Sequence, residues 1–350
     1  MTSFVKYKII WLHYGVENAK WDTPILMNLQ QKYSDLIQVI PLNVKELSSL
    51  SDLRQIFDKH NIGLAINRVS DAQNPTVTKW TMTILNYVEQ VHKIEVLNGS
   101  LCYSIGMSKS LQGCILEESL LLGYPKTKII SLSSFHDHPT KEQSKHVQTA
   151  GLAVGFPLLI KPNAGGFGKG IQKVKTKLQW DNLFLSPSSE SLNFSFISSF
   201  QHSNDFVLLL QKFHEDADFY RIWHLGGSVQ FGIQVLSPNK TNSKIGEDFN
   251  SCVCKSSSSN TSSPLTFLWF EPDETIKEEI SRITDACKAA MGSVEYLQHK
   301  QSGKRYYFDI NMLSTLPHLD VIDFKDDQEK QKWKDPHRQV ADYIWDQLNR

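Results

Sequence analysis

Short apolar runs alternate with segments of helical periodicity along the N-terminal part of the chain. The apolar runs are typical of buried strands and cover residues 8–15, 37–41, 63–69 and 95–98. Residues 23–33, 53–60 and 78–92 separate these runs and have the periodicity of helices. Strands that alternate with helices in this way predict a parallel sheet covered by helices. We therefore expect an α/β unit in this part of the chain.

The pattern changes after about residue 100, where strands follow one another with fewer helices between them. It predicts helices at residues 108–122, 273–291 and 335–348, and strands at 206–213, 219–225, 229–235, 293–297 and 305–311. Residues 237–264 are rich in Ser and Asn and poor in apolar positions, which predicts a mobile loop. This part of the chain is therefore expected to be α+β.

A glycine-rich segment at residues 155–176 is the most informative chemical feature of the sequence. An apolar run ends at Lys161, a glycine-dense turn carries Lys169, and apolar alternation resumes at residue 171. This pattern predicts two strands joined by a flexible loop, with one cation on a strand and one in the loop. Glycines let backbone N–H groups approach an anion, and lysines neutralise phosphate charge. The segment indicates a clamp for nucleotide phosphates; the alternative is a glycine-rich hairpin with solvated lysines.

Two well-known phosphate loops do not fit this segment. A Walker A loop needs a glycine where Asn163 stands, and a serine or threonine where Gly170 stands. The dinucleotide-binding fingerprint fails because the glycine spacing differs and no helical pattern follows. The phosphate clamp must therefore belong to another class.

A second candidate site lies in a hairpin near the end of the chain. Residues 293–297 and 305–311 form its strands, and its turn centres near Ser302, so Glu295 faces Asp309. Asn311 lies two residues beyond Asp309 and therefore projects from the same face. Two opposed carboxylates are unfavourable without a cation, and hard oxygen ligands suit Mg²⁺. The hairpin predicts a magnesium site; the alternative is a polar face in water, which the apolar neighbours Ile310, Met312 and Leu313 make less favourable.

Composition narrows the class of protein. The chain has 350 residues, no formal net charge and five scattered cysteines. Charge neutrality gives no general electrostatic reason to bind nucleic acid or a membrane surface, and no apolar stretch is long enough to span a bilayer. The odd cysteine count favours reduced thiols, and the first residues lack the pattern of a signal peptide. We expect a cytoplasmic protein without nucleic-acid or membrane partners, and we allow for a homodimer.

In order and spacing, these motifs resemble the ATP-grasp superfamily, in particular carboxylate–amine ligases of the D-Ala-D-Ala ligase type. The resemblance covers roughly residues 100–315. It implies an N-terminal α/β domain with a parallel sheet over residues 1–125. Two α+β subdomains that clamp ATP are implied over residues 126–213 and 214–350. The cofactors that it implies are ATP and Mg²⁺, or Mn²⁺ in its place.

The resemblance also implies roles for individual residues. Arg221 and Lys169 correspond to cations that act on the reacting phosphate, and Glu295, Asp309 and Asn311 to metal ligands. The ATP-binding positions that it implies are Lys109, Lys161, Gly165, Gly166, Gly168, Lys169, Gln211, Lys212, Phe213, Glu215 and Asp218.

Three departures from the family pattern bear on the efficiency of the reaction more than on ATP binding. Gln211 stands where an acidic residue is often found, and Asp309 replaces the usual, longer Glu. Gln234 occupies a position that often supplies a second basic residue. Another cation could enter from the predicted loop, for example Lys240, Lys244 or Lys255.

Arg68 is a weaker candidate for a substrate contact. It follows a predicted parallel strand, and ligands gather at the carboxyl ends of such strands. The alternative is an exposed arginine in a loop.

Three functions remain open from the sequence. The first is ATP-dependent ligation of a small carboxylate to an amine or another nucleophile through an acylphosphate. The second is phosphorylation of a small alcohol by the same fold. The third is a regulatory protein that binds ATP without turnover, for which the Asp309 and Gln234 departures speak.

Overall fold

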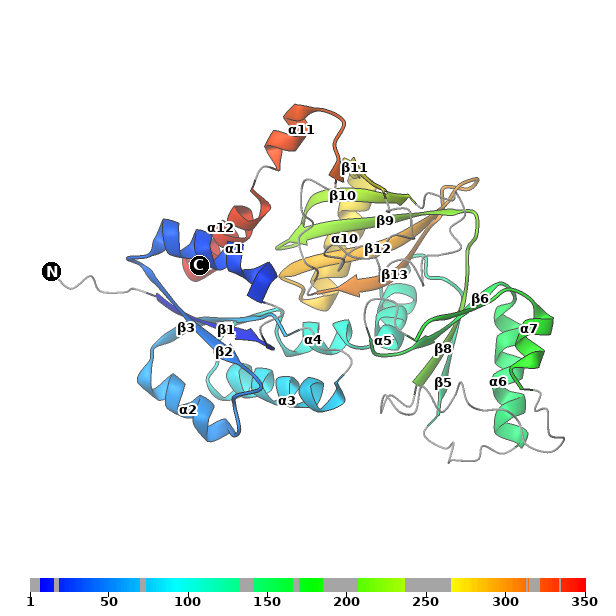
Figure 1. The fold of residues 1–350 in the computed structure, drawn as a ribbon, viewed down its shortest axis with the longest axis horizontal. Helices are drawn as coiled ribbons and strands as arrows, with labels where there is room; N and C mark the ends of the chain where they lie inside the picture. The colour runs from blue at the N-terminus through cyan, green and yellow to red at the C-terminus, as the bar shows by residue number, and fades with distance from the viewer. Residues whose placement is uncertain are drawn as a thin grey trace, which may run out of the picture.

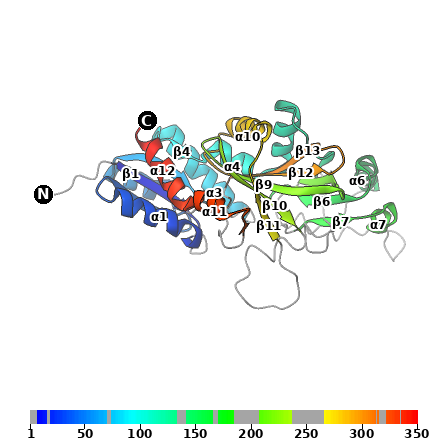
Figure 2. The same ribbon diagram turned by 90° about the horizontal axis from the view of Figure 1, so that it is seen from above.

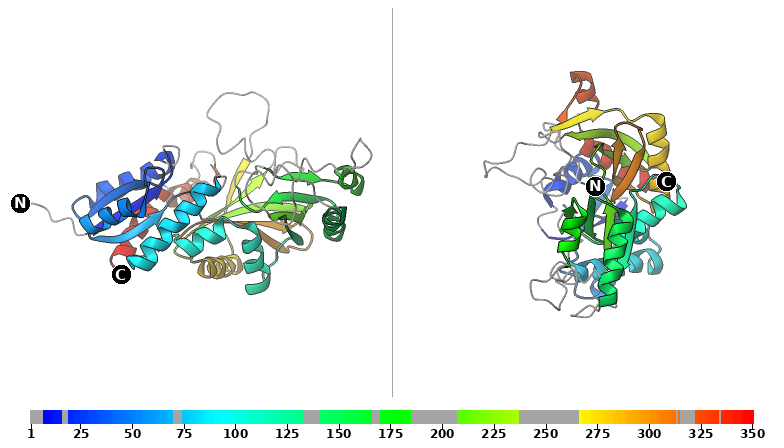
Figure 3. Two further views of the ribbon diagram at one scale, coloured as in Figure 1. Left: turned by 90° about the horizontal axis from the view of Figure 1, so that it is seen from below. Right: turned by 90° about the vertical axis from the view of Figure 1, so that its right-hand side faces the viewer.

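Three β-sheets make up the part of the protein that the structure describes. The computed structural model describes residues 7–15, 19–69, 74–132, 141–165, 170–184, 207–236, 266–312, 314, 322–333 and 335–350. The N-terminal unit and the central sheet lie at opposite ends of the molecule, with the C-terminal sheet between them (Figures 1 and 3). The predicted combination of a parallel α/β unit with α+β units is confirmed.

The N-terminal unit is a parallel sheet in the order β2-β1-β3-β4. Its core is built by apolar side chains on both faces of these strands, as expected for a helix-covered parallel sheet. Its strands and helices are β1 (Tyr7–His13), α1 (Ala19–Tyr33), β2 (Ile37–Asn43), α2 (Leu50–Lys59), β3 (Ile62–Asn67), α3 (Pro75–Asn86), the π-helical turn η1 (Tyr87–Val91) and β4 (Val96–Leu97).

The helix near the C-terminus, α12 (Pro336–Leu348), packs against α1 of this N-terminal unit (Figures 1 and 2). Asp335 caps its first turn by accepting a hydrogen bond from a backbone N–H. Trp345 stacks on Tyr33 with ring centroids 4.5 Å apart, and Lys32 lies 2.6 Å from Asp342. The two ends of the described chain are therefore joined in one core.

The central sheet is antiparallel, in the order β5-β8-β6-β7. Trp180 is fully buried in its core, and a Cβ atom at Gly151 would lie 2.4 Å from the Trp180 ring. Glycine at this position therefore lets α6 approach α7 closely. The elements are β5 (Thr127–Ser131), α6 (Lys141–Val154), β6 (Leu158–Pro162), β7 (Gln172–Val174), α7 (Lys177–Asn182) and β8 (Val207–Lys212).

The C-terminal sheet is mostly antiparallel, in the order β13-β12-β9-β10-β11-β14. One face packs on α10 (Glu274–Cys287), and the other carries a separate apolar cluster around Trp223 and Phe231. The strands are β9 (Ala217–Leu225), β10 (Ser228–Leu236), β11 (Thr266–Phe270), β12 (Met291–His299), β13 (Arg305–Asn311) and β14 (Ile322–Asp323). The helices α4 (Ser100–Gly106) and α5 (Lys109–Cys114) with the turn η2 (Ile115–Ser119) connect the N-terminal unit to the other two sheets, and α11 (Asp327–Lys332) precedes α12.

The structure corrects several predicted elements. The helix expected at residues 273–291 ends at Cys287, because Lys288 has a left-handed backbone (φ 52°), and Met291 instead begins β12. The helix expected at residues 108–122 divides into α5 and η2. The pattern missed α4, β5, α6, α7, β11, β14 and α11. The loop predicted at residues 237–264 lies outside the described residues.

Within the described part of the chain, no helix is both long and apolar enough to cross a lipid bilayer.

Candidate nucleotide and metal site

A row of charged side chains runs across three neighbouring strands of the C-terminal sheet. Arg221 on β9 lies opposite Glu295 on β12, and Glu295 lies opposite Asp309 on β13. The predicted pairing of Glu295 with Asp309 is therefore confirmed. Residues in direct cross-strand register project from one face, so the three charges form a continuous line. Arg221 forms an ion pair with Glu295, and Lys109 Nζ lies 2.9 Å from Asp309 Oδ1.

Burial shapes the charge state of this row. Burial raises the pKa of Glu295, whose side chain is 7% exposed; the charge of Arg221 lowers it, and Asp309 raises it again. Burial alone would lower the pKa of Lys109, but the charge of Asp309 and the hydrogen bond to it raise that pKa above its ordinary value. Each carboxylate is thus stabilised by one cation, as buried charges require.

The donor set of the row fits a hard divalent cation. Asn311 lies two residues beyond Asp309, opposite Ser293, and so projects from the same face as the two carboxylates. Two carboxylates and one amide oxygen are the ligand types that Mg²⁺ accepts. Among the residues that the structure describes, no group of three or more His, Cys, Asp and Glu side chains forms a candidate metal centre.

The central sheet contributes a third cation, Lys161, whose hydrogen-bond partner is a neutral amide. Lys161 on β6 is 6% exposed, and its Nζ donates to Gln211 Oε1 of β8 over 2.6 Å. Gln211 Nε2 in turn donates to Thr127 Oγ1 over 3.1 Å. The pKa of Lys161 is lowered to about 8: burial is the main cause and the charge of Lys109 adds to it, whereas Asp309 and Glu295 partly offset both. Lys161 Nζ also lies 5.2 Å from the centroid of the Phe308 ring, next to Asp309, which brings it close to the charged row.

Two polar residues fix Lys109 between the two sheets, and the sequence analysis did not assign a role to either. Asn163, which follows β6, accepts hydrogen bonds from the backbone N–H of Ser110 with Oδ1 (2.8 Å) and of Lys109 with its carbonyl oxygen (3.0 Å). Gln112 is fully buried and exchanges hydrogen bonds with the backbone of Ile310, next to Asp309. Nothing in the sequence around Gln112 indicates its role. The position of Asn163, directly after the strand that carries Lys161, is a signal from which its role could have been predicted.

Three further predicted ATP-binding residues, Lys212, Phe213 and Glu215, lie at or just after the end of β8. Phe213 N–H donates to the Pro157 carbonyl oxygen over 3.0 Å, and Lys212 Nζ donates to the Phe156 carbonyl oxygen over 2.5 Å. Glu215 is paired with Lys173 at 3.1 Å. These contacts tie the end of β8 to the β6–β7 hairpin, although Lys212 is directed toward the backbone and away from the charged row.

Asp218 and Gln234 project from the face of the C-terminal sheet opposite the charged row. Asp218 lies three residues before Arg221 on β9, so it projects from the opposite face, where it is 3.4 Å from Lys300. Gln234 lies opposite Tyr220 and therefore also projects from that face, whereas Ile233 is the direct neighbour of Arg221. The row thus receives no polar side chain from either position.

The glycine-rich turn is described at its two ends, Gly165 and Gly170, and not between them. Gly165 has a positive φ of 132°, which a residue with a side chain rarely adopts. Gly166, Gly168 and Lys169 lie outside the described residues, as do Lys240, Lys244 and Lys255.

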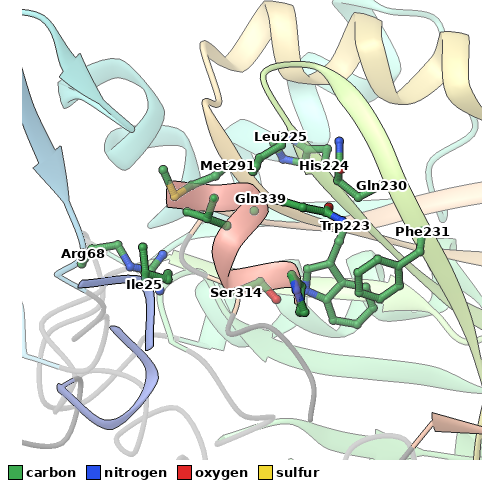
Figure 4. A pocket seen from close by; sticks show the side chains of 13 residues that line it. Ile25, Arg68, Trp223, His224, Leu225, Gln230, Phe231, Met291, Ser314 and Gln339 are labelled. Carbon is green, nitrogen blue, oxygen red and sulfur yellow. The ribbon is translucent and has the colours of Figure 1, made fainter. Parts of the chain in front are cut away.

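Arg68 is buried rather than exposed in a loop. Its side chain is 8% exposed, and its Nε lies 2.9 Å from Asp22 Oδ1. The same carboxylate accepts a hydrogen bond from Trp11 Nε1 over 3.0 Å. Arg68 lines a pocket together with Trp223 of β9, so it faces the C-terminal sheet across the junction of the two units (Figure 4).

Comparison with known proteins shows which of them this chain resembles. No family model matches the chain. A stretch of 196 residues is 26% identical to the mitochondrial propionyl-CoA carboxylase alpha chain of Mus musculus; it covers 55% of this chain and spans only 23% of that protein's length.

Solved structures resemble the whole chain. The D-alanine–D-alanine ligase of Bacillus anthracis complexed with ATP is 15% identical, with a TM-score of 0.58 and coverage of 98% of this chain and 97% of that one. D-alanyl-alanine synthetase A of Vibrio cholerae is 13% identical, with a TM-score of 0.63 and coverage of 99% and 100%. The ATP-grasp ligase PsnB complexed with its minimal precursor is 10% identical, with a TM-score of 0.59 and coverage of 97% and 98%. The chain therefore has the fold of the ATP-grasp ligases.

Proposed function

We propose that this protein is an ATP-dependent ligase that joins a small carboxylate to an amine, releasing ADP and phosphate. One observation carries the proposal: Lys161 from the central sheet, whose Nζ lies 5.2 Å from the centroid of the Phe308 ring next to Asp309, adjoins a row of two carboxylates flanked by Arg221 and Lys109. Cations from two separate sheets suit a triphosphate that bridges them. We also propose that the domain boundaries lie near residues 125 and 213, so that ATP is clamped between the second and third units.

The chemistry needs no nucleophile from the protein. A carboxylate oxygen of the substrate attacks the γ-phosphorus of ATP, the bond from that phosphorus to the bridging oxygen breaks, and ADP leaves with the electron pair. The amine then attacks the acyl carbon of the acylphosphate, phosphate leaves, and the nitrogen loses one proton. In this scheme Arg221, Lys109 and Lys161 neutralise and orient the phosphate oxygens, which is the main protein contribution to phosphoryl transfer.

Glu295, Asp309 and Asn311 are the proposed ligands of Mg²⁺. Bound there, a divalent cation supplies charge neutralisation at the phosphate oxygens. The two carboxylates are already matched by Arg221 and Lys109 in the structure, and phosphate oxygens are competing partners for the same two cations. The ion-paired row therefore keeps the ligands aligned without leaving a buried charge unpaired.

The test is ADP release from ATP and Mg²⁺ with pooled amino acids and small carboxylic acids. A ligase requires a pool component, releases phosphate and forms a product with the mass of a new amide. At ATP concentrations below saturation, Lys161→Ala should strongly reduce this turnover, whereas Lys128→Ala, which changes an exposed lysine on β5 of the same sheet, should not.

The outcomes separate the remaining functions. A phosphorylated product without phosphate release would indicate the kinase, and tight ATP binding without turnover would indicate a regulatory protein. Absence of ATP binding would overturn the proposal in every form.

A further inference from the structure

Two of the proposed metal ligands, Asp309 and Asn311, lie on the outermost strand of the C-terminal sheet. In the described structure, this strand, β13, pairs with β12 on one side and with no strand on the other. The backbone groups along such an edge need other partners, because a buried N–H or C=O group is costly to leave unpaired. The positions of Asp309 and Asn311 therefore depend on what occupies this edge.

A side-chain amide occupies the edge at Ile310. Gln112 of α5 accepts a hydrogen bond from the Ile310 N–H with Oε1 over 3.0 Å, and its Nε2 donates to the Ile310 carbonyl oxygen over 3.2 Å. Figure 1 shows α5 beside β13. The Gln112 side chain thus pairs with β13 as a neighbouring strand would, through one donor and one acceptor.

The same amide ties this edge to the helix before α5. Gln112 Nε2 also lies within hydrogen-bond distance of the carbonyl oxygens of Ile105 (3.1 Å) and Gly106 (3.3 Å), at the end of α4. Gln112 is completely buried, so water cannot take the place of its amide. An apolar side chain of similar volume would fill the space but would leave the N–H and C=O groups of Ile310 without this partner.

Ile310 is the residue between the two ligands. Its backbone torsion angles determine how the side chains of Asp309 and Asn311 are directed on the face that they share. Lys109, one turn before Gln112 on α5, has its Nζ 2.9 Å from Asp309 Oδ1. One short helix therefore supplies both the cation beside Asp309 and the amide that fixes the strand on which Asp309 lies.

Mg²⁺ is sensitive to such positioning, because it requires nearly octahedral oxygen ligands at about 2.1 Å. Groups that hold metal ligands in place without touching the metal commonly change metal affinity by about 10- to 100-fold. We propose that Gln112 is a positioning residue that sets the spacing of Asp309 and Asn311 for a divalent cation. This role rests on the proposed function, because it requires a metal at these ligands. Gln112 acts through the backbone of β13, since its own side chain is fully buried.

The test measures how much Mg²⁺ strengthens ADP binding. Calorimetric titrations of ADP in excess MgCl₂ and in EDTA give the factor by which the metal raises the affinity, so any change in metal-independent ADP binding cancels. Gln112→Met removes both hydrogen bonds to Ile310 at nearly constant volume and should reduce this factor about tenfold or more. A residue that only stabilised the fold would lower the unfolding temperature on substitution and leave the factor unchanged.

Leu53→Ala is the matched control for loss of stability. Leu53 is fully buried on α2 of the N-terminal unit, which lies at one end of the molecule (Figure 1), and its truncation destabilises a core that does not hold β13 in place. Both variants are titrated well below their unfolding temperatures. Leu53→Ala should keep the metal enhancement of ADP binding that Gln112→Met loses. An unchanged factor in Gln112→Met, or an equal loss in Leu53→Ala, overturns the positioning role.

Hydrogen exchange in the wild type gives a second measurement, which decides the question even if Gln112→Met does not fold. Coupling between two sites is reciprocal, so a metal that depends on the contact between Gln112 and Ile310 must also stabilise that contact. The Ile310 amide should therefore exchange more slowly with ADP and Mg²⁺ than with ADP and EDTA. The Tyr307 amide, which donates to the Gly123 carbonyl oxygen over 2.8 Å, is the control and should change less. No change at Ile310, or an equal change at both amides, overturns the role.

Failure of the proposed metal site gives a different result. If Mg²⁺ does not change the ADP affinity of the wild type, the metal site is wrong and the role of Gln112 is wrong with it. If Mg²⁺ strengthens ADP binding equally in the wild type and in Gln112→Met, only the role of Gln112 is wrong. No step of the test uses turnover, so a metal enhancement that is lost in Gln112→Met supports the role even if no carboxylate promotes ADP release.

Discussion

The two buried lysines of the candidate site have opposite charge behaviour. Lys109 Nζ is 2.9 Å from a carboxylate, Asp309, and this partner raises the pKa of Lys109 despite its burial. Lys161 Nζ is 2.6 Å from a neutral amide, Gln211, and burial lowers the pKa of Lys161 to about 8. Both side chains are largely removed from water, so the charge of the partner decides the difference, not the depth of burial.

The comparison divides the site into two halves. On the C-terminal sheet, each cation of the row lies against a carboxylate, Arg221 against Glu295 and Lys109 against Asp309. On the central sheet, Lys161 is half deprotonated near pH 8. Phosphate binding should therefore depend on pH through the central sheet, and structural integrity should depend on the ion pairs of the C-terminal sheet.

Removing one partner of the ion-paired half should have the largest effect. Glu295→Ala leaves Arg221 without its carboxylate in a setting where only 12% of the Arg221 side chain is exposed. Breaking a buried pair in this way should lower the free energy of unfolding by about 3–5 kcal/mol. Urea denaturation at pH 7 measures the loss. The control is Lys277→Ala, which removes the exposed pair with Glu274 and should cost much less. Similar losses in the two variants would contradict the assignment of Glu295 to a buried pair.

Asp309→Ala tests the same half through activity. It removes a proposed metal ligand and the anion that holds Lys109, so ADP release should fall about 10²- to 10³-fold. Asp181→Ala, which removes the exposed pair with Lys177 on α7, should retain activity. If the wild type binds ATP but releases no ADP, the protein is a binding protein and not a ligase.

The hairpin shows how far local sequence reasoning reaches. Counting outward from Ser302 places Glu295 opposite Asp309 and Ser293 opposite Asn311, and both pairs are found. The same count pairs Tyr296 with Phe308, yet Tyr296 lies opposite Tyr307, because a bulge shifts the ladder after Glu295. A bulge depends on the packing around the strand, so pattern counting cannot locate it.

Contacts between distant parts of the chain could not be predicted from the sequence. The buried amide of Asn98 donates to the carbonyl oxygens of Met291 (2.9 Å) and Met312 (2.7 Å), which joins the N-terminal unit to β12 and β13. Asn98 also has a left-handed backbone with φ 56°, a conformation that asparagine tolerates better than most residues. The helix α12 was predicted, but its docking on α1 was not, because amphipathic periodicity reveals an apolar face and not its partner.

The half of the site on the central sheet should give a smaller and pH-dependent effect. Lys161→Ala should weaken ATP binding about 10- to 100-fold at pH 7, the scale of a hydrogen bond to a charged group. The pKa of Lys161 lies near 8, so the cation is present below that pH and is lost as the pH rises through it. The difference between wild type and variant in calorimetric titrations should therefore shrink between pH 7 and pH 9. A constant difference, or an equal loss in the exposed control Lys128→Ala, would contradict a charged role for Lys161.

Gln211→Glu should give Lys161 a charged partner, as Asp309 is for Lys109. A carboxylate in place of the Gln211 amide would lie beside Lys161 as Asp309 lies beside Lys109, and it should raise the pKa of Lys161 by about one unit or more. The pH at which ATP affinity declines should move upward by the same amount, while affinity at pH 7 changes little because Lys161 is already protonated there. Gln172→Glu, an exposed position on β7 of the same sheet, provides the matched control and should leave the pH profile unchanged. If Gln211→Glu also leaves the midpoint where it is, the decline belongs to another group, and the contrast between the two lysines does not control nucleotide binding.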